Sequence, residues 1–186
     1  MAFRAQLWGV AADEVALSFP CDDVIARPDA TYFRGVTIDA PASTVFRWLC
    51  QLRLAPYSYD WIDNRGRRSP RHLTPEIDQL RVGQDVMTIF TLIAFDQDRH
   101  LTIRIKPRSN GARVFGDIAG SYVVVPQDPR TSRLLVKLIV RYPSGLVGQL
   151  MRAFLPWGDL VMMRRQLLNL KALAEAQRSE TRDSGR

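Results

Sequence analysis

The sequence predicts an α+β fold in which an antiparallel sheet is covered by a long amphipathic helix near the carboxyl end. Segments with alternating apolar and polar residues follow one another between 86 and 142, separated by short turn-forming stretches. Further along, apolar residues recur every three or four positions, as on one face of a helix: Leu160, Met163, Leu167, Leu170 and Ala174. The 186 residues, 46% of them hydrophobic, suffice for one domain with a sizeable core.

A first strand is expected at residues 31–38, TYFRGVTI, which is rich in β-branched and aromatic residues. Pro41 then suits the start of a helix. Apolar residues of that helix have the spacing of a stripe that faces a core: Val45, Trp48, Leu49 and Leu52. Pro56 ends the helix, and residues 55–64, APYSYDWIDN, are expected to form a second short helix or helical turn.

Strands follow in the central part of the chain. They are expected at VMTIFTLIAF from Val86, at HLTIRI (100–105), in ARVFGDIAG, in SYVVVPQ and in SRLLVKLIVRY (132–142). In the last of these, the residues from Leu134 to Val140 that share a face are apolar, whereas Lys137 and Arg141 lie on the other face. The sheet is therefore expected to have a covered apolar face and an open polar face.

The segment 144–158, SGLVGQLMRAFLPWG, carries apolar residues at helical spacing. Three interpretations stay open for it: a mobile lid over a cavity, a surface that contacts a membrane, and an ordinary helix packed on the core. Asp159 is expected to cap or complement the amino end of the final helix. The last residues, SETRDSGR, are expected to fray because none of them is apolar.

Composition and motifs exclude several classes of function. The net charge of +7 comes from basic residues that are spread widely, and no nucleic-acid motif accompanies the one dense cluster, from Arg65 to Arg71. Cys21 and Cys50 do not have the spacing of metal ligands or of a disulfide scaffold. Without a glycine-rich phosphate loop or a metal cluster, we expect no metal and no cofactor. We expect a soluble, cytoplasmic protein, since no secretory signal or membrane-length apolar run is seen.

Several phrases of the sequence resemble the START-like superfamily, also called SRPBCC. VTIDAPASTVFRWLCQL (36–52) is similar to its first strand and helix, and YSYDWIDN (57–64) is similar to the YSYDWLEN phrase of polyketide-cyclase-like bacterial members. Residues 8–23, with PCDD where PGDD is usual, resemble the extension that precedes the first strand, and MMRRQLLNLKALAE (162–175) resembles the closing helix. The resemblance implies the helix-grip fold: a curved antiparallel sheet wrapped around a long C-terminal helix, with two short helices after the first strand.

The resemblance also implies a domain layout and a class of function. An extension (1–30) would pack on a START-like domain (31–178) that ends in a frayed tail (179–186). Similar proteins bind lipids, sterols, polyketides or other apolar molecules between the sheet and the last helix. We therefore expect binding of an apolar small molecule, by a monomer or homodimer with transient membrane contact and no nucleic-acid partner. The alternatives are a cofactor-independent cyclase or dehydratase and a membrane-surface lipid carrier.

No catalytic residue is assigned from the sequence, but the following residues are candidates for the wall of a ligand pocket: Tyr57, Tyr59, Trp61, Ile103, Tyr122, Val136, Leu138, Phe154, Trp157, Met163 and Leu167. Because Tyr57, Tyr59 and Trp61 alternate, they cannot all face one cavity. The favoured interpretation is that Trp61 and one tyrosine plug the end of the core.

Other polar residues have less support as site residues. Asp60 and Asp63 are three positions apart and could act as an acid/base pair, but capping or pairing with arginine is favoured. His72 and His100 have no visible orienting partner and are expected to be solvated. Asp117, Tyr122 and Arg141 could reach a ligand if a strand twists or bulges, and a surface position is favoured for Arg141.

Overall fold

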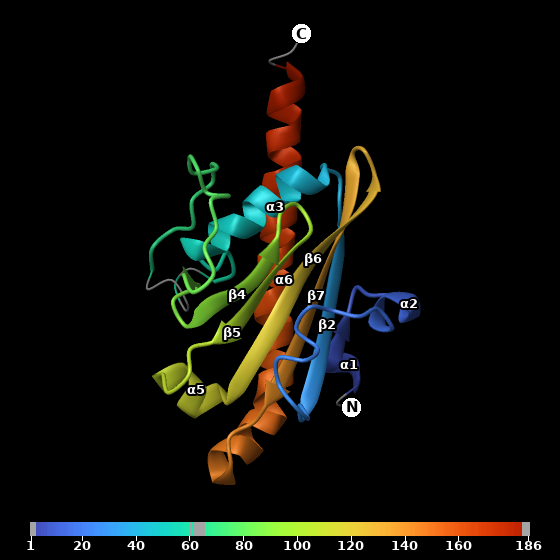
Figure 1. The fold of residues 1–186 in the computed structure, drawn as a ribbon. Helices are drawn as coiled ribbons and strands as arrows, with labels where there is room; N and C mark the ends of the chain where they lie inside the picture. Colours follow the sequence, from blue (N-terminus) through green and yellow to red (C-terminus); the bar gives the residue numbers. More distant parts are fainter. Residues whose placement is uncertain (1–2, 60, 62–65, 184–186) are drawn as a thin grey trace.

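The computed structural model describes residues 3–59, 61 and 66–183, and Figure 1 shows one sheet with a long helix behind it. In the described part of the chain the sheet has seven strands in the order β1-β2-β7-β6-β5-β4-β3. All neighbours are antiparallel except the short pair β1 and β2. The strands are β1 (Leu7–Trp8), β2 (Ala30–Ile38), β3 (Asp85–Val86), β4 (Phe90–Asp96), β5 (His100–Ile105), β6 (Asp117–Asp128) and β7 (Thr131–Arg141).

The helices confirm the predicted helix-grip arrangement. They are α1 (Phe3–Gln6), α2 (Ala12–Val15), α3 (Ala42–Cys50), the 3-10 helix η1 (Gln51–Arg53), α5 (Asn110–Phe115) and α6 (Gly145–Asp183). Helices α3 and α6 pack on the same face of the sheet, and the main core lies between them and the strands. The predicted apolar faces of β5 and β7 and the stripe of α6 from Met163 to Ala174 all belong to this core.

Helix α6 is one continuous helix of 39 residues. The segment 144–158 and the final helix are therefore parts of a single element, which passes through Pro156. Asp159 lies inside this helix and does not cap its amino end, so that prediction was wrong. Helical structure continues to Asp183, into the region 179–186 that the sequence predicts to fray; the boundaries of the extension and the tail stay predictions.

Two of the segments that the sequence predicts as strands have a different secondary structure. The run from Val86 to Phe95 is interrupted by a turn at Met87 and Thr88, whose φ angles are +46° and +65°. The start of ARVFGDIAG is helix α5, because the Ser109 hydroxyl accepts a hydrogen bond from the Ala112 N–H at 3.1 Å and so caps a helical turn. Gly116 then reverses the chain with a φ of +86° before β6 begins.

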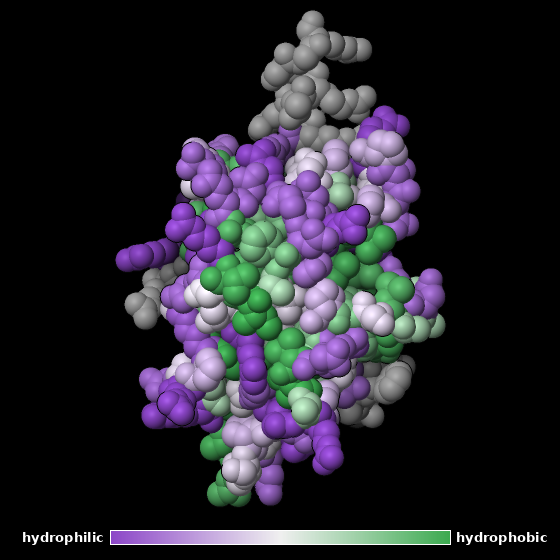
Figure 2. Space-filling view, viewed as in Figure 1, coloured by the Kyte–Doolittle hydropathy of each residue, from purple (hydrophilic) through white to green (hydrophobic). Residues whose placement is uncertain are grey.

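We call residues 5–25 the N-terminal strap (blue in Figure 1); the part of it that follows β1 covers some of the second face of the sheet. Phe19, Cys21 and Ile25 of the strap are buried in a second apolar cluster with Phe33 and residues of β6 and β7. Figure 2, viewed from this side, shows hydrophobic residues in the middle of the face among hydrophilic ones. The prediction of an open polar face was therefore wrong where the strap lies.

Basic residues of β2 and β7 fasten the strap to the sheet. The Arg133 guanidinium donates to the Glu14 carboxylate at 2.6 Å, and the Lys137 ammonium pairs with Asp22 at 2.5 Å. The Arg34 guanidinium donates to backbone carbonyl oxygens of the strap. None of the helices in this described structure is long and apolar enough to cross a membrane.

Candidate functional site

A cavity of about 790 Å³ lies between the sheet and helix α6. The strands, the β3–β4 turn and helix α5 supply most of the apolar lining, and α6 closes one side. Representative lining residues from these elements are Phe90, Ile103, Phe115, Ile118, Leu138 and Met163. Leu54, Arg67 and Thr88 are exposed and form part of its rim. The cavity therefore opens to solvent near the β3–β4 turn and has apolar walls.

Three polar side chains occupy the inner wall of this cavity: Tyr122 on β6, and Asp159 and Gln166 on α6. The Tyr122 hydroxyl donates to Gln166 Oε1 at 2.8 Å. Gln166 Nε2 in turn donates to the Pro56 carbonyl oxygen at 2.6 Å. These bonds fix the two side chains, as expected for polar groups that are almost fully buried.

Asp159 is paired with Arg34, a fully buried residue of β2. The Arg34 Nη2 donates to Asp159 Oδ2 at 2.6 Å, and its guanidinium also donates to the carbonyl oxygens of Ala5, Gln6 and Phe33. The Arg34 side chain is 0% exposed and that of Asp159 is 13% exposed. The carboxylate is thus the member of the pair that lines the cavity.

Burial shifts the titration of both acidic groups in this wall. It raises the pKa of Asp159 to about 6, although the neighbouring Arg34 charge opposes the shift. Burial also raises the pKa of Tyr122 well above its usual value, and the Asp159 charge adds to that effect. Tyr122 is therefore a neutral phenol, while the charge of Asp159 changes at about pH 6.

The predicted pocket residues fall into three groups. Ile103, Tyr122, Leu138 and Met163 line the cavity. Tyr57, Val136 and Leu167 are buried in the core without lining it. Tyr59 is half-buried away from the cavity wall, and Trp61, Phe154 and Trp157 are exposed by 75%, 65% and 50%. Which of them contacts a ligand stays a prediction.

Of the three aromatic residues in the stretch APYSYDWIDN, all of which the structure describes, Tyr57 alone is buried in the core. The Tyr57 hydroxyl accepts from Gln51 Nε2 at 3.0 Å and donates to the Pro70 carbonyl oxygen at 2.8 Å, and its ring packs edge-on against Trp48. The exposure of Trp61 shows that its predicted role in the core was wrong. Asp60 and Asp63 lie outside the described residues.

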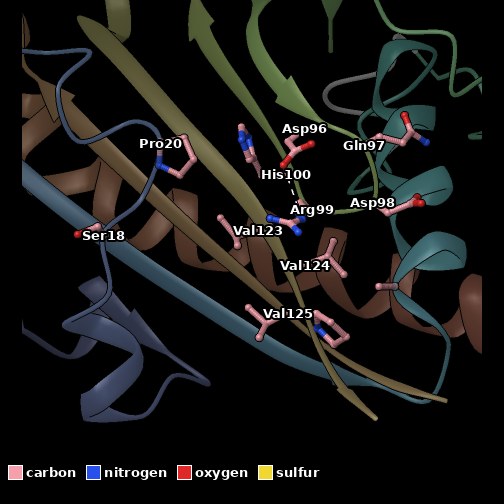
Figure 3. A pocket seen from close by; sticks show the side chains of 12 residues that line it. Ser18, Pro20, Asp96, Gln97, Asp98, Arg99, His100, Val123, Val124 and Val125 are labelled. Atoms are coloured by element: carbon pink, nitrogen blue, oxygen red, sulfur yellow. Dashed lines mark ion pairs between the residues drawn. The ribbon is translucent and has the colours of Figure 1, made fainter. Parts of the chain in front are cut away.

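A second hollow, of about 600 Å³, lies on the strap side of the sheet. Figure 3 shows Ser18 and Pro20 of the strap to one side of Val123, with the segment 96–100 around the other end. His100 lies here with Nδ1 lacking a hydrogen-bond partner, and burial lowers its pKa. His100 is half-buried, so the prediction that it is solvated was wrong. Asp96, Asp98 and Arg99 lie around the same hollow, and Asp96 pairs with Arg99 at 3.7 Å.

The remaining polar candidates lie away from the cavity. His72 is exposed, and Asp117 pairs with Arg104 at 2.6 Å on the strap side of the sheet. Arg141 is also exposed. Among the residues that the structure describes, no three His, Cys, Asp or Glu side chains gather as a metal site would require.

Sequence reasoning missed Arg34, Asp159 and Gln166 as parts of a site. One signal was available: Asp159, Met163, Gln166 and Leu170 follow one another at helical spacing, so two polar residues interrupt the apolar stripe. Arg34 stands likewise inside a strand that is otherwise mostly apolar. Polar residues on a core-facing stripe indicate a buried polar cluster.

Comparison with known proteins places the fold. No family model and no curated protein matches the sequence. A hypothetical protein of Helicobacter pylori has a similar structure, with a TM-score of 0.54, 14% identity, and coverage of 85% of this chain and 95% of that one. A Mesorhizobium loti protein has a TM-score of 0.50 and 14% identity, with coverage of 79% of this chain and 98% of that one.

A third similar structure is the di-domain ARO/CYC BexL from the BE-7585A biosynthetic pathway. Its TM-score is 0.51 at 12% identity, with coverage of 78% of this chain. The chain spans 46% of the length of BexL. Together these likenesses confirm the predicted helix-grip fold.

Proposed function

We propose that the protein binds a small apolar molecule in the cavity between the sheet and helix α6. The cavity itself carries the proposal: its volume of about 790 Å³ lies within the range of small-molecule sites, and its walls are mostly apolar with a few fixed polar groups. The fold likeness to an ARO/CYC protein also favours a cavity that holds an organic molecule.

Pyrene, a fluorescent hydrocarbon without polar groups, is a direct probe of this proposal. We expect it to bind the wild-type protein and to bind Met163→Trp at least about tenfold more weakly, because a larger side chain at a buried position of α6 fills the cavity. The matched control is Val161→Trp, on the same helix but 53% exposed, which should bind pyrene as the wild type does.

Native mass spectrometry of gently purified protein is the complementary measurement, since a co-purified apolar molecule would identify the natural ligand class. Absence of pyrene binding by the folded wild-type protein would contradict the proposal. Equal binding by folded Met163→Trp would place the probe outside this cavity and would contradict it as well.

A second candidate function is a carrier that takes up its ligand at a membrane surface. An exposed apolar row along α6 favours it: Leu146, Leu150, Phe154, Trp157 and Val161. Leu155, Gly158 and Met162 of the same helical segment line the cavity, so a surface seated on the row would lie next to the cavity. Co-sedimentation with anionic vesicles tests this candidate.

A further inference from the structure

We propose that the inner wall of the cavity selects ligands whose buried polar group is a hydrogen-bond donor, such as a hydroxyl or an ammonium group, and rejects anionic groups. Asp159 is the residue that makes this selection. The inference rests on the proposed function, because it specifies the chemistry of a ligand held in the same cavity.

In the inner wall, the hydrogen-bond donors of Tyr122 and Gln166 are already bound to protein acceptors, whereas some acceptor oxygens remain available to a ligand. The Tyr122 proton is used on Gln166 Oε1, and Gln166 Nε2 is used on the Pro56 carbonyl oxygen and on Met87 Sδ at 3.3 Å. The Tyr122 oxygen keeps lone pairs that can accept. A ligand group that only accepts hydrogen bonds would therefore find no free donor on Tyr122 or Gln166.

Asp159 supplies the strongest acceptor. Its Oδ2 is engaged by Arg34, whereas no hydrogen bond from the described residues reaches Oδ1. Asp159 lines the cavity and stays partly exposed, so Oδ1 is the unpaired oxygen of a carboxylate in a mostly apolar wall. An acceptor in such surroundings is stabilised when a ligand donates to it, and a ligand without a donor leaves it unsatisfied.

Of the Arg34–Asp159 pair, only the negative charge of Asp159 faces the cavity. Arg34 is fully buried and enclosed by the carbonyl oxygens of Ala5, Gln6 and Phe33, so a ligand in the cavity meets the carboxylate and not the guanidinium. In a water-poor site the repulsion between Asp159 and an anionic ligand group is stronger than in bulk water. A cationic group at the same place is attracted.

Selection should weaken on acidification. The titratable and charged groups around Asp159 are Arg34 and Tyr32 on β2 and Tyr122 on β6, and Arg67 lies at the rim of the same cavity. Because burial raises the Asp159 pKa to about 6, the carboxylate is ionised above that pH and takes up a proton as the pH falls through it. The protonated carboxyl group has no charge to repel an anion and can itself donate a hydrogen bond.

Three probes with the same decyl chain and different head groups test the inference: 1-decanol, decylammonium and decyl sulfate. At about pH 7.5 we expect the wild-type protein to bind decanol and decylammonium at least about tenfold more tightly than decyl sulfate. At about pH 5 this preference should shrink several-fold. Displacement of bound pyrene measures all three affinities.

Asp159→Asn removes the charge with little change in shape and should abolish most of the preference at about pH 7.5. Glu175→Gln, on the same helix away from the cavity, is the matched control and should keep it. The double variant Arg34→Gln Asp159→Asn removes both charges, so it separates loss of the carboxylate from the effect of an unpaired buried arginine. If Asp159→Asn does not fold, the pH dependence of the wild-type protein decides.

The two proposals fail in different ways. If pyrene binds but the three head groups bind equally, or decyl sulfate binds best, the selection by Asp159 is wrong while the cavity function stands. If Glu175→Gln loses the preference as Asp159→Asn does, Asp159 is not its source. If pyrene does not bind, the proposed function itself fails.

Discussion

Arg34 is a strand residue whose side chain is completely enclosed, which is rare for a charged group. Its guanidinium is accommodated because it donates to three backbone carbonyl oxygens and to Asp159. Two of the carbonyls belong to residues at the start of the strap and the carboxylate belongs to α6. One side chain therefore joins the strap, the sheet and the cavity wall.

Replacing Arg34 by methionine should destabilise the protein by roughly 3–5 kcal/mol, because a buried carboxylate and several carbonyl oxygens lose their donor. Urea unfolding followed by circular dichroism measures the change. Arg99→Met is the control: Arg99 is 78% exposed, and its loss should change the free energy of unfolding by less than about 0.5 kcal/mol. Similar losses in both variants would contradict a special role of the enclosed pair.

The aromatic residues at 57–61 show where the sequence pattern fails to predict the burial of single side chains. Tyr57 has a left-handed backbone with a φ of +57°, a conformation that non-glycine residues rarely adopt. The backbone turns at Tyr57, and the side chains of Tyr59 and Trp61 do not follow it into the core. This explains why the density of aromatic residues predicts a core position correctly for Tyr57 and wrongly for Trp61.

At the scale of elements, the N-terminal strap depends on charged contacts as well as on its apolar cluster. The hydrogen bond from Arg133 is the largest influence on Glu14 and lowers the pKa of its carboxyl group. A lowered pKa in the folded state means that the pair stabilises the strap above the usual pKa of glutamate. That stabilisation is lost as the pH falls through the folded-state value.

Glu14→Gln should therefore loosen the strap without unfolding the domain. We expect backbone amide hydrogens in residues 5–25 to exchange with solvent about tenfold faster at neutral pH. The reason is that a charge-assisted contact contributes about 1–2 kcal/mol to the free energy of local unfolding of the strap. Hydrogen exchange with mass spectrometry resolves this region. Asp13→Asn, at an exposed neighbour in α2, should leave exchange unchanged; acceleration there too would show that the Arg133 contact is not responsible.

Periodicity predicts the long elements well and their junctions poorly. The alternating faces of β5 and β7 and the stripe of α6 follow directly from residue spacing. Pro156 suggests a break between two helices because it lacks a backbone donor, but it is buried within a continuous α6. The Ser109 cap likewise overrides the strand-like composition of the residues in α5.

At the scale of the whole molecule, the sequence predicts the fold but not the inner surface of its cavity. The cavity is the space left between the segment that follows η1, the sheet, α5 and α6, and its volume depends on how these elements pack. Arg34 and Asp159 are 125 residues apart, so their pairing follows from the tertiary structure and not from local pattern. The proposed class of ligand follows from the resemblance, whereas the proposed polar selection rests on the side-chain geometry.

Net charge and the exposed apolar row of α6 together make a prediction about membrane surfaces. The formal charge of +7 attracts the whole molecule to anionic lipid, and apolar side chains of the row can then insert into the interface. We expect the protein to sediment with phosphatidylglycerol vesicles at low salt and to be released as screening increases at about 0.5 M salt. Neutral phosphatidylcholine vesicles should retain much less.

The double variant Phe154→Ser Trp157→Ser tests the row itself. It should weaken vesicle binding at least about tenfold, because two large apolar side chains that would be buried in the membrane interface are absent. Leu17→Ser Val82→Ser is the matched control, since both residues are exposed and apolar but lie outside α6. Equal loss in the two double variants would indicate that general surface hydrophobicity, and not the row, causes binding. Failure of the wild-type protein to bind anionic vesicles at low salt would contradict the carrier candidate, whereas ligand binding in the cavity does not depend on a membrane.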